Sequence, residues 1–237
     1  QRQMCIRDSY RDLVNCDIVD AVDICTSNDA HFKVAMAAVE AGKPFNLEKP
    51  ITLTAEEADI LAKAAQEKNV KNMVCFSYRF KAAARYAKDL IAQGKIGRVY
   101  HVNMQYFQAW GLPRANCPLV WRYVKSRTGT GALGDLGSHA LDLVRFVTNK
   151  EYTRVVGHTG TYVHERPLLD GKGVGKVDVD DFSNYMADME DEISVSFQIT
   201  RFAYGRGNYQ RMEIYGSEGA IVYSLDATPA VIDEIEV

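Results

Sequence analysis

The sequence has no strong excess of either charge and no compositional extreme. Its 237 residues include 28 Lys and Arg against 31 Asp and Glu, for a formal net charge of -3, and 47% of them are hydrophobic. A disordered acidic tail, a collagen-like repeat and a cationic nucleic-acid binder each need such an extreme, so these three classes are excluded. The composition is that of a globular protein, and we expect a small molecule, not a nucleic acid, as its partner.

Long apolar runs and cysteine pairs are missing as well. No uncharged apolar run approaches the roughly 18 residues that span a bilayer, and no basic stretch followed by apolar residues opens the chain. The number of cysteines is odd, and no Cys-x-x-Cys spacing is available for a metal or for redox chemistry. We therefore expect no membrane partner and a cytoplasmic protein whose cysteines are small core residues. They are Cys5, Cys16, Cys25, Cys75 and Cys117.

Short apolar segments alternate with helical patterns in the first third of the chain. The apolar segments are residues 18–25, 45–47 and 72–77, and the stretches between them carry apolar residues at helical spacing. Thr54 and Glu57 form a capping box at the start of the second such helix. This order is typical of parallel strands joined by right-handed crossovers, so it predicts part of a doubly wound, Rossmann-type sheet.

The pattern changes after residue 80. A helix is expected over 81–93, and from residue 99 onward apolar and polar residues alternate as in half-buried antiparallel strands. The strand candidates are residues 99–107, 155–163, 182–189, 193–200, 212–215 and 220–223. We predict an α/β chain in which a partial Rossmann-type parallel sheet (residues 10–77) precedes an α+β domain with a large open, mostly antiparallel sheet (residues 78–237).

The stretch GTGALGDLGSHALDLVRF, residues 129–146, contains a glycine motif. Its first six residues fit G-x-G-x-x-G, in which backbone amides cradle the phosphates of a dinucleotide. That motif follows an apolar strand, whereas residues 121–128 are rich in charge. A tight loop that leads into a helix is therefore the favoured interpretation.

Three polar residues follow the glycines at helical spacing. Asp135 and His139 are four positions apart and Asp142 is three further on, which places them on one face of a helix, while Leu136, Ala140, Leu143 and Val147 form another stripe. A carboxylate beside an imidazole orients the ring and favours its protonated form, so His139 is a candidate general base. A solvated face with an incidental ion pair and a three-ligand metal site are the alternatives.

Polar residues also follow the first two predicted strands. Lys49 comes after the strand at 45–47, at the edge where open parallel sheets bind ligands, and it could hold or polarise an oxygen there. Thr26, Ser27, Asn28 and His31 follow the strand at 18–25 and suit a ribose or a nicotinamide. Helix capping explains Asn28 or Asp29 fully and is the favoured interpretation of any one of these residues, and a solvated turn explains Glu48-Lys49-Pro50.

Taken together, these pieces resemble the glucose-fructose oxidoreductase, inositol dehydrogenase and MocA (Gfo/Idh/MocA) family from about residue 10 to the end. The matching pieces are Cys25-Thr26-Ser27-Asn28 with His31, Glu48-Lys49-Pro50, Tyr78-Arg79-Phe80, Trp121-Arg122 and the Asp135/His139 helix. Residues 108–110 and 118–122 look most similar to the levoglucosan and inositol dehydrogenase-like members. The resemblance implies an NAD(P)-dependent oxidoreductase with a Rossmann domain followed by a domain built on a large open sheet.

The resemblance also implies roles for individual residues. Hydride would pass between a sugar or cyclic polyol carbon and nicotinamide, with NAD or NADP as cofactor, no metal, and Lys49 and His139 meeting across a cleft. The implied catalytic residues are Lys49, Asp135 and His139; the implied cofactor contacts are Thr26, Ser27, Asn28, His31, Glu48, Lys49 and Arg122; and the implied substrate contacts are Lys49, Tyr78, Arg79 and Asp142. Copies of the chain are expected to associate through the open sheet.

The chain departs from the family pattern at both ends. The first strand with its glycine fingerprint does not precede residue 10, and the chain stops soon after residues 216–224. We therefore expect a fragment that binds dinucleotide poorly and in which NAD and NADP cannot be distinguished, and we expect the polar, aperiodic residues 1–9 to be a non-native scar. A non-catalytic sugar-binding or regulatory relative, and a metal-dependent hydrolase or isomerase that uses Asp135, His139 and Asp142, are the alternative functions.

Overall fold

The chain forms two compact units in the computed structural model, which describes residues 8–225 and 234–236. The first unit comprises residues 1–75 and 126–129, and the second comprises residues 76–125 and 130–237. The expected scar falls mostly on residues 1–7, which lie outside the described residues, but Ser9 caps the first helix by accepting a hydrogen bond from the Arg11 N–H at 3.2 Å. Within the described ranges, every helix is too short or too polar to cross a membrane.

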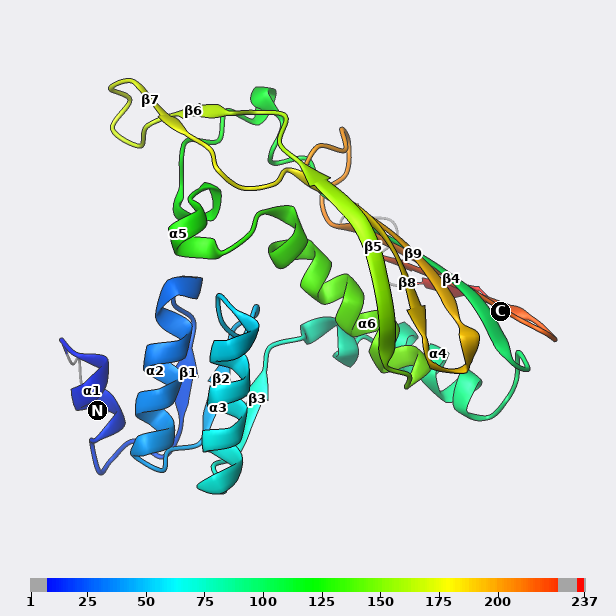
Figure 1. Ribbon diagram of the computed structural model, residues 1–237, viewed down its shortest axis with the longest axis horizontal. Helices are drawn as coiled ribbons and strands as arrows, with labels where there is room; N and C mark the ends of the chain where they lie inside the picture. The colour runs from blue at the N-terminus through cyan, green and yellow to red at the C-terminus, as the bar shows by residue number, and fades with distance from the viewer. Residues whose placement is uncertain (1–7, 226–233, 237) are drawn as a thin grey trace, which may run out of the picture. The chain divides into compact units, whose positions relative to one another are not determined.

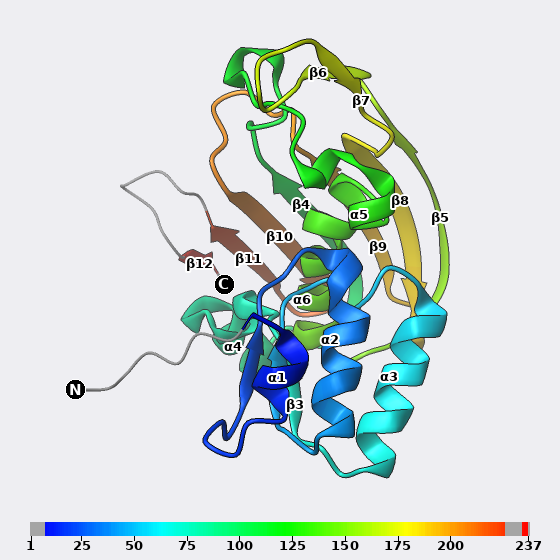
Figure 2. The ribbon, with the colours of Figure 1, turned by 90° about the vertical axis from the view of Figure 1, so that its left-hand side faces the viewer.

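The first unit contains a parallel three-stranded sheet in the order β1-β2-β3. Its elements are α1 (Tyr10–Val14), β1 (Val22–Ile24), α2 (Asn28–Glu40), β2 (Phe45–Leu47), α3 (Ala55–Glu67) and β3 (Asn72–Val74). The helices α2 and α3 lie side by side along the sheet (Figures 1 and 2). This arrangement confirms the predicted partial Rossmann-type sheet.

Local sequence explains where these elements begin and which face they bury. The Thr54 hydroxyl accepts the Glu57 N–H at 3.2 Å, and the Glu57 carboxylate accepts the Leu53 N–H at 3.2 Å, so the predicted capping box starts α3. The strand predicted over 18–25 is shorter, because Ile18 is 71% exposed. In β1 the outer residues are buried against the helices and Asp23 is exposed, which is the alternation of a half-buried strand.

The second unit is built on a seven-stranded sheet in the order β12-β11-β10-β4-β9-β8-β5. Its helices and short turns are η1 (Ser77–Phe80), α4 (Ala82–Ala92), η2 (Pro113–Ala115), η3 (Trp121–Tyr123), the π-helix η4 (Leu133–Gly137), α6 (Ser138–Thr148) and η5 (Glu190–Glu192), while α5 (Lys125–Thr128) crosses the unit boundary. Its strands are β4 (Val99–Phe107), β5 (Tyr152–Gly160), β8 (Phe182–Met189), β9 (Ser194–Thr200), β10 (Tyr209–Gly216), β11 (Ala220–Leu225) and β12 (Glu234–Glu236), with β6 (Glu165–Pro167) and β7 (Val174–Lys176) in a separate hairpin. All neighbours in the large sheet are antiparallel except β4 and β9, which confirms the predicted open, mostly antiparallel sheet.

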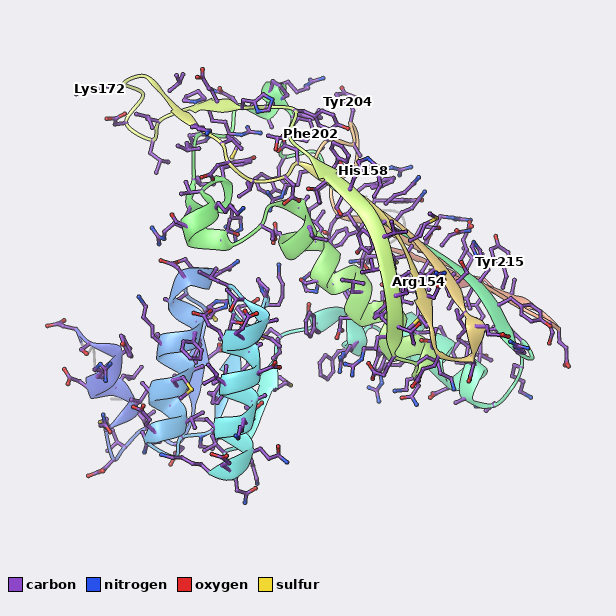
Figure 3. The ribbon with its side chains drawn as sticks, viewed as in Figure 1. Arg154, His158, Lys172, Phe202, Tyr204 and Tyr215 are labelled. Carbon is purple, nitrogen blue, oxygen red and sulfur yellow. The ribbon has the colours of Figure 1, made fainter. Side chains whose placement is uncertain are left out.

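The helices α4 and α6 pack against one face of this sheet and form its core. The predicted apolar stripe is buried there: Leu136, Ala140, Leu143 and Val147 are at most 1% exposed. The opposite face of the sheet carries the alternate side chains, of which Arg154, His158 and Tyr215 are labelled in Figure 3. The second unit therefore has a closed apolar face and an open, largely polar one.

One turn has an unusual backbone, and the expectation for the cysteines needs correction. The turn between β8 and β9 lacks a glycine, and Asp191 (φ 57°) and Glu192 (φ 61°) take the left-handed conformations instead. The prediction that the cysteines are core residues is wrong for Cys16, Cys25 and Cys75, whereas Cys117 packs against a small core cluster. Cys25 is exposed, and Cys16, Cys75 and Cys117 are only partly buried; the Cys75 thiol, for example, donates to the Asn46 side-chain oxygen at 3.2 Å beside a strand end.

Candidate active site

The helix that carries the candidate base begins with a π-helical turn. Asp135 lies in the π-helix η4, and His139 and Asp142 lie in α6, which continues from it without a break (Figure 1). A π-turn widens the helix and shifts the angular offset between residues, and such turns are frequent at functional sites. His139 and Asp142 are each only 9% exposed, so the alternative of a solvated helix face is wrong.

The glycine motif serves the start of this helix. The Asp180 carboxylate accepts hydrogen bonds from the Gly131 N–H at 2.6 Å and the Leu133 N–H at 2.7 Å, and the Asp180 carbonyl accepts the Ala132 N–H at 2.9 Å. A Cβ on Gly131 would lie 1.8 Å from the Asp180 carbonyl oxygen, so this close approach requires glycine. A carboxylate thus occupies the amides that a phosphate would need, and the short helix α5 precedes the loop. The tight-loop interpretation is confirmed.

Aromatic rings surround the His139 imidazole. Its ring centroid lies 4.8 Å from that of Tyr78 and 5.9 Å from that of Phe76, both in edge-on contact, and 6.3 Å from that of Tyr106. These rings belong to the segment at η1 and to β4, so two elements of the second unit enclose the imidazole of α6. Packing of this kind holds the ring in one orientation.

A polar network continues from the aromatic contacts. The Tyr78 and Tyr106 hydroxyls are 2.7 Å apart, the Tyr106 hydroxyl donates to the Asn208 side-chain oxygen at 2.7 Å, and the Asn208 amide donates to the Tyr78 hydroxyl at 2.8 Å. Gln108 donates to Asn208 at 2.9 Å and accepts the Trp110 indole N–H at 2.6 Å. Burial raises the pKa of Tyr106, and the neighbouring Tyr78 and Asp135 raise it further, so this hydroxyl keeps its proton.

Asp142 and Arg79 bind each other. The Arg79 Nε donates to Asp142 Oδ2 at 2.7 Å, and its Nη2 donates to Oδ1, which makes a bidentate ion pair. The Asp142 side chain is 8% exposed and that of Arg79 is 36% exposed. Both residues were expected to contact substrate, and in the structure they contact each other within the second unit. Arg79 presents the more accessible group of the two.

Asp135 also has an arginine partner, which the sequence analysis missed. The Arg201 Nη2 donates to Asp135 Oδ2 at 2.9 Å, and the Arg201 side chain is fully buried. Arg201 directly follows β9 and lies 66 positions beyond Asp135, where no local motif distinguishes it. Tyr106, Gln108 and Asn208 were missed for the same reason, because their contacts join segments that are distant in sequence.

In the first unit, His31 has a structural partner at each ring nitrogen. Its Nδ1 lies 2.8 Å from the Pro50 carbonyl oxygen and its Nε2 lies 3.2 Å from the Thr26 carbonyl oxygen, and the residue is fully buried. The imidazole therefore ties the end of β1 to the turn after β2, which contains a cis Lys49–Pro50 peptide. The contacts described for His31 are structural, and its expected place at the nicotinamide stays a prediction.

Glu48, Lys49 and Thr26 lie at the carboxyl ends of the strands. Thr26 is exposed, whereas Glu48 and Lys49 are half-buried, and the Lys49 N–H donates to the Glu48 carboxylate at 3.2 Å. This edge of a parallel sheet is where ligands of such folds bind. Arg122 belongs to the second unit, is exposed, and stacks on the Trp121 ring at 4.4 Å.

The polar residues after β1 bind the returning segment 126–129. The Asn28 amide donates to the Thr128 carbonyl at 3.1 Å and to its hydroxyl at 3.2 Å, and Arg127 pairs with Asp29 at 2.8 Å and donates to Ser27 at 2.9 Å. Burial opposes ionisation of Asp29, but the Ser27 and Arg127 hydrogen bonds outweigh it and lower its pKa. Simple helix capping is therefore the wrong interpretation of Asn28, because its side chain points to this segment.

Metal ligation receives no support from the described geometry. Within residues 8–225, no group of three or more His, Cys, Asp or Glu side chains is arranged to hold an ion. Two of the three candidate ligands in α6 and η4, Asp135 and Asp142, are already in ion pairs with arginines. Proton transfer by His139 is the chemistry that the enclosed imidazole suits best.

Comparison with known proteins places this geometry in a family. Residues 84–222 match the GFO/IDH/MocA C-terminal domain, and residues 4–76 match an oxidoreductase family with an NAD-binding Rossmann fold. Levoglucosan dehydrogenase from Pseudarthrobacter phenanthrenivorans is 37% identical over 240 residues, which cover 96% of this chain and 60% of that protein. Inositol 2-dehydrogenase from Rhizobium meliloti is 30% identical over 204 residues, which cover 86% of this chain and 56% of that protein.

Solved structures agree with these matches. An oxidoreductase domain protein from Kribbella flavida is 39% identical, with a TM-score of 0.86, and the alignment covers 96% of this chain and 63% of that one. A levoglucosan dehydrogenase in complex with NADH and levoglucosan is 35% identical, with a TM-score of 0.87, and the alignment covers 97% of this chain and 64% of that one. The chain thus spans less than two thirds of the length of these relatives. Because the C-terminal-domain match extends over more than half of the chain, the chain belongs to the GFO/IDH/MocA family.

Proposed function

We propose that this chain is part of an NAD(P)-dependent dehydrogenase that transfers a hydride between a hydroxyl-bearing carbon of a sugar or cyclic polyol and nicotinamide. The observation that carries the proposal is the His139 site, in which a nine-tenths buried imidazole is enclosed by Tyr78 and Tyr106 on the helix that also carries Asp135. Family members of known activity support it, since they include levoglucosan and inositol dehydrogenases.

In the proposed reaction, His139 accepts the proton of the substrate hydroxyl. We assign the transfer to Nε2, because Nδ1 is buried away from solvent. An imidazole titrates near neutral pH, so it can take up a proton and release it again in each turnover. The edge-on rings of Tyr78 and Phe76 keep the imidazole from rotating. Lys49 serves the same step by donating a charge-assisted hydrogen bond to the oxygen as it becomes negative.

Nicotinamide, when bound, supplies the hydride acceptor or donor. The residues present fit its end of the dinucleotide: Thr26 offers an exposed hydroxyl after β1, and Glu48 and Lys49 offer a carboxylate and an ammonium group after β2. The glycine loop at 129–134 does not fit a pyrophosphate, because Asp180 fills it. We therefore assign Thr26, Glu48 and Lys49 to the nicotinamide end and give His31 the role of holding that edge together.

A hydroxyl-rich substrate suits the polar groups beside His139. The Tyr78 hydroxyl, the Arg79 guanidinium and the Asn208 amide are each half-buried. Arg79 and Asn208 can donate hydrogen bonds, whereas the Tyr78 hydroxyl gives its proton to Tyr106 and can accept one. Arg79 is held in place by Asp142, so it can present a fixed donor without a large loss of side-chain entropy. We propose Tyr78 and Arg79 as substrate contacts and Asp142 as the group that orients Arg79.

Activity measurements on a version of the chain extended to the length of its relatives would test this proposal. Levoglucosan, inositols and common sugars are screened for reduction of NAD+ and NADP+ by the absorbance of the reduced nicotinamide. We expect His139→Asn and Lys49→Met to lower turnover by about 10²- to 10⁴-fold while cofactor affinity stays close to that of the parent. The matched controls His164→Asn and Lys33→Met alter exposed residues and keep activity. Full turnover by His139→Asn would refute the proposed role.

We also propose that two copies associate through the open face of the large sheet. Exposed apolar side chains lie there beside charged groups of both signs. Val156 and Met186 are 64% and 61% exposed, and Arg211 pairs with Glu213 at 2.8 Å. Charges of both signs on one face can pair with a second copy across a two-fold axis. Figure 3 labels His158 and Tyr215 on the same face.

The molar mass in solution tests this association. We expect the parent chain to elute as a dimer or larger assembly in light-scattering measurements, and Met186→Glu with Val156→Glu to give the monomer. Ile60→Glu is the control, because Ile60 is 53% exposed on α3 of the first unit. A parent chain that is monomeric at all accessible concentrations would contradict the proposed association.

A further inference from the structure

Two buried arginines approach the same tyrosine ring in the second unit. The Arg166 Cζ lies 4.0 Å and the Arg201 Cζ 6.0 Å from the centroid of Tyr123, and Arg201 also stacks on Trp110 at 4.6 Å. Arg166 is 2% exposed and Arg201 is fully buried. The two side chains thus share burial, charge and an aromatic neighbour, which makes any difference between them informative.

The difference lies in their hydrogen-bond acceptors. Arg166 donates to two backbone carbonyls, those of Cys117 at 3.3 Å and Gly111 at 2.5 Å. Arg201 donates to the Asp135 carboxylate at 2.9 Å, and its Nε and Nη1 have no hydrogen-bond partner in the described part of the chain. Arg201 is therefore directed at the carboxylate that shares a helix with His139.

The Arg201 side chain is fully buried and that of Asp135 is 21% exposed, so this ion pair is costly to keep, and stability alone does not explain it. Removing two charges from water costs about as much as their mutual attraction returns, and apolar replacements of similar volume often fold as well. A guanidinium keeps its proton at every accessible pH, so Arg201 is a permanent cation. It holds one oxygen of Asp135 in place and favours the ionised carboxylate.

The other charged and titratable groups around His139 have different hydrogen-bond partners from Asp135. Arg79, at η1, is already paired with Asp142 of α6 in a bidentate contact. The Tyr106 hydroxyl of β4 stays protonated because burial raises its pKa, and Tyr78 contributes a hydroxyl hydrogen-bonded to it. Among the described residues, Arg201 is the cation that pairs with Asp135.

We propose that Arg201 is a positioning residue that fixes the Asp135 carboxylate and balances its charge, so that His139 stays neutral and ready to accept a proton. The inference rests on the proposed function, because it assumes that His139 is the base. Without the Arg201 cation, the Asp135 carboxylate, whose side chain is 21% exposed, would favour a proton on His139 instead, and the base would be blocked at neutral pH.

An NMR titration of the His139 imidazole in the 237-residue chain tests this inference without turnover. The resonance is assigned by its loss in His139→Asn. We expect Arg201→Met to move the titration midpoint upward by about one pH unit or more, which is typical for the loss of a nearby charge. Arg166→Met is the matched control: it removes a buried arginine that stacks on Tyr123 and whose hydrogen bonds in the described residues go to carbonyls, and the midpoint should stay where it is. Arg201→Lys keeps a charge and should give a smaller upward shift than Arg201→Met.

A second variant covers the case in which Arg201→Met does not fold. Asp135→Asn is nearly isosteric and leaves Arg201 unopposed, so the His139 midpoint should move downward. A folded Arg201→Met or Asp135→Asn protein with an unchanged midpoint would overturn the inference.

Activity of the extended enzyme then separates this inference from the proposed function. Arg201→Met should shift the acid limb of its kcat/KM profile upward by the same amount as the titration. If the midpoints shift as expected but His139→Asn retains full turnover, the proposed function fails and the positioning of Asp135 stands. If His139→Asn is inactive and the midpoints do not move, the reverse holds.

Discussion

Substitution of Gly131 by alanine is expected to destabilise the loop that precedes η4 and α6, the helix that carries His139. A Cβ at this position would lie 1.8 Å from the Asp180 carbonyl oxygen, 2.7 Å from its carbonyl carbon and 2.8 Å from its nitrogen. All three are backbone atoms, so the loop that carries Asp180 must move. Overpacking of this kind costs about 1–3 kcal/mol. The movement also weakens the hydrogen bonds from Gly131 and Leu133 to the Asp180 carboxylate, each worth about 1.5–3 kcal/mol. We expect a total loss of about 3–5 kcal/mol.

Gly134→Ala provides the matched control within the same motif. Its Cβ would lie 2.1 Å from the Thr130 hydroxyl and 3.5 Å from the Thr130 Cβ, and a hydroxyl can turn aside where a backbone cannot. Replacing glycine within a helix returns up to about 1 kcal/mol, so the net change should stay within about 1 kcal/mol. Urea unfolding followed by the fluorescence of Trp110 and Trp121, both in the second unit, measures the difference. Equal stabilities for the two variants would refute the steric argument.

Three further substitutions address ionic and hydroxyl groups. Arg79→Met leaves the Asp142 carboxylate buried without its partner, and we expect the free energy of unfolding in urea to fall by about 1–3 kcal/mol. The loss is smaller than for a fully buried pair because Arg79 is 36% exposed. Replacing Asp142 by Leu in the same protein should restore stability, and no recovery in this double variant would contradict the cause. The pKa of Asp29 is lower in the folded protein than in the unfolded chain, where it is about 3.9. The ion pair with Arg127 therefore stabilises the fold fully at pH values above the unfolded pKa, and this stabilisation is lost as the pH falls through the folded pKa. The deficit of Asp29→Asn in unfolding free energy should therefore be constant above about pH 5 and vanish in acid, and a deficit that persists there would argue against it. Tyr106→Phe should lower kcat more than it raises KM in the extended enzyme, since it removes a hydroxyl from the network around the base; an unchanged kcat would exclude that contribution.

Much of the fold follows from patterns within short segments. Alternation at a spacing of two predicts β4 and β8 with the bounds that the structure has, and the capping box at Thr54 predicts the start of α3. The order of the seven strands, and the parallel pairing of β4 with β9, could not be read in the same way. Pairing depends on contacts between distant segments, about which local periodicity is silent.

The candidate site divides along the same line. The spacing of Asp135, His139 and Asp142 is local, and it predicts a shared helix that the structure confirms, apart from the π-turn at its start. The partners Arg201 and Asn208 come from segments 66 and 130 positions away from the residues that they contact, Asp135 and Tyr78. Asn28 was misinterpreted as a cap for the same reason, since its partner lies 100 positions away. That Lys49 and His139 act on one hydroxyl group stays a prediction.

The segment Ser126–Gly129 belongs to the first unit although its neighbours on both sides belong to the second, so the polypeptide passes from one unit to the other three times. A gene fragment that stops at residue 75 would strip Asn28 and Asp29 of Thr128 and Arg127. A chimera made by joining residues 1–75 of one relative to the remainder of another would combine Asn28 and Asp29 of one protein with the segment 126–129 of the other. Recombination or domain shuffling in such a protein therefore has to carry both pieces together.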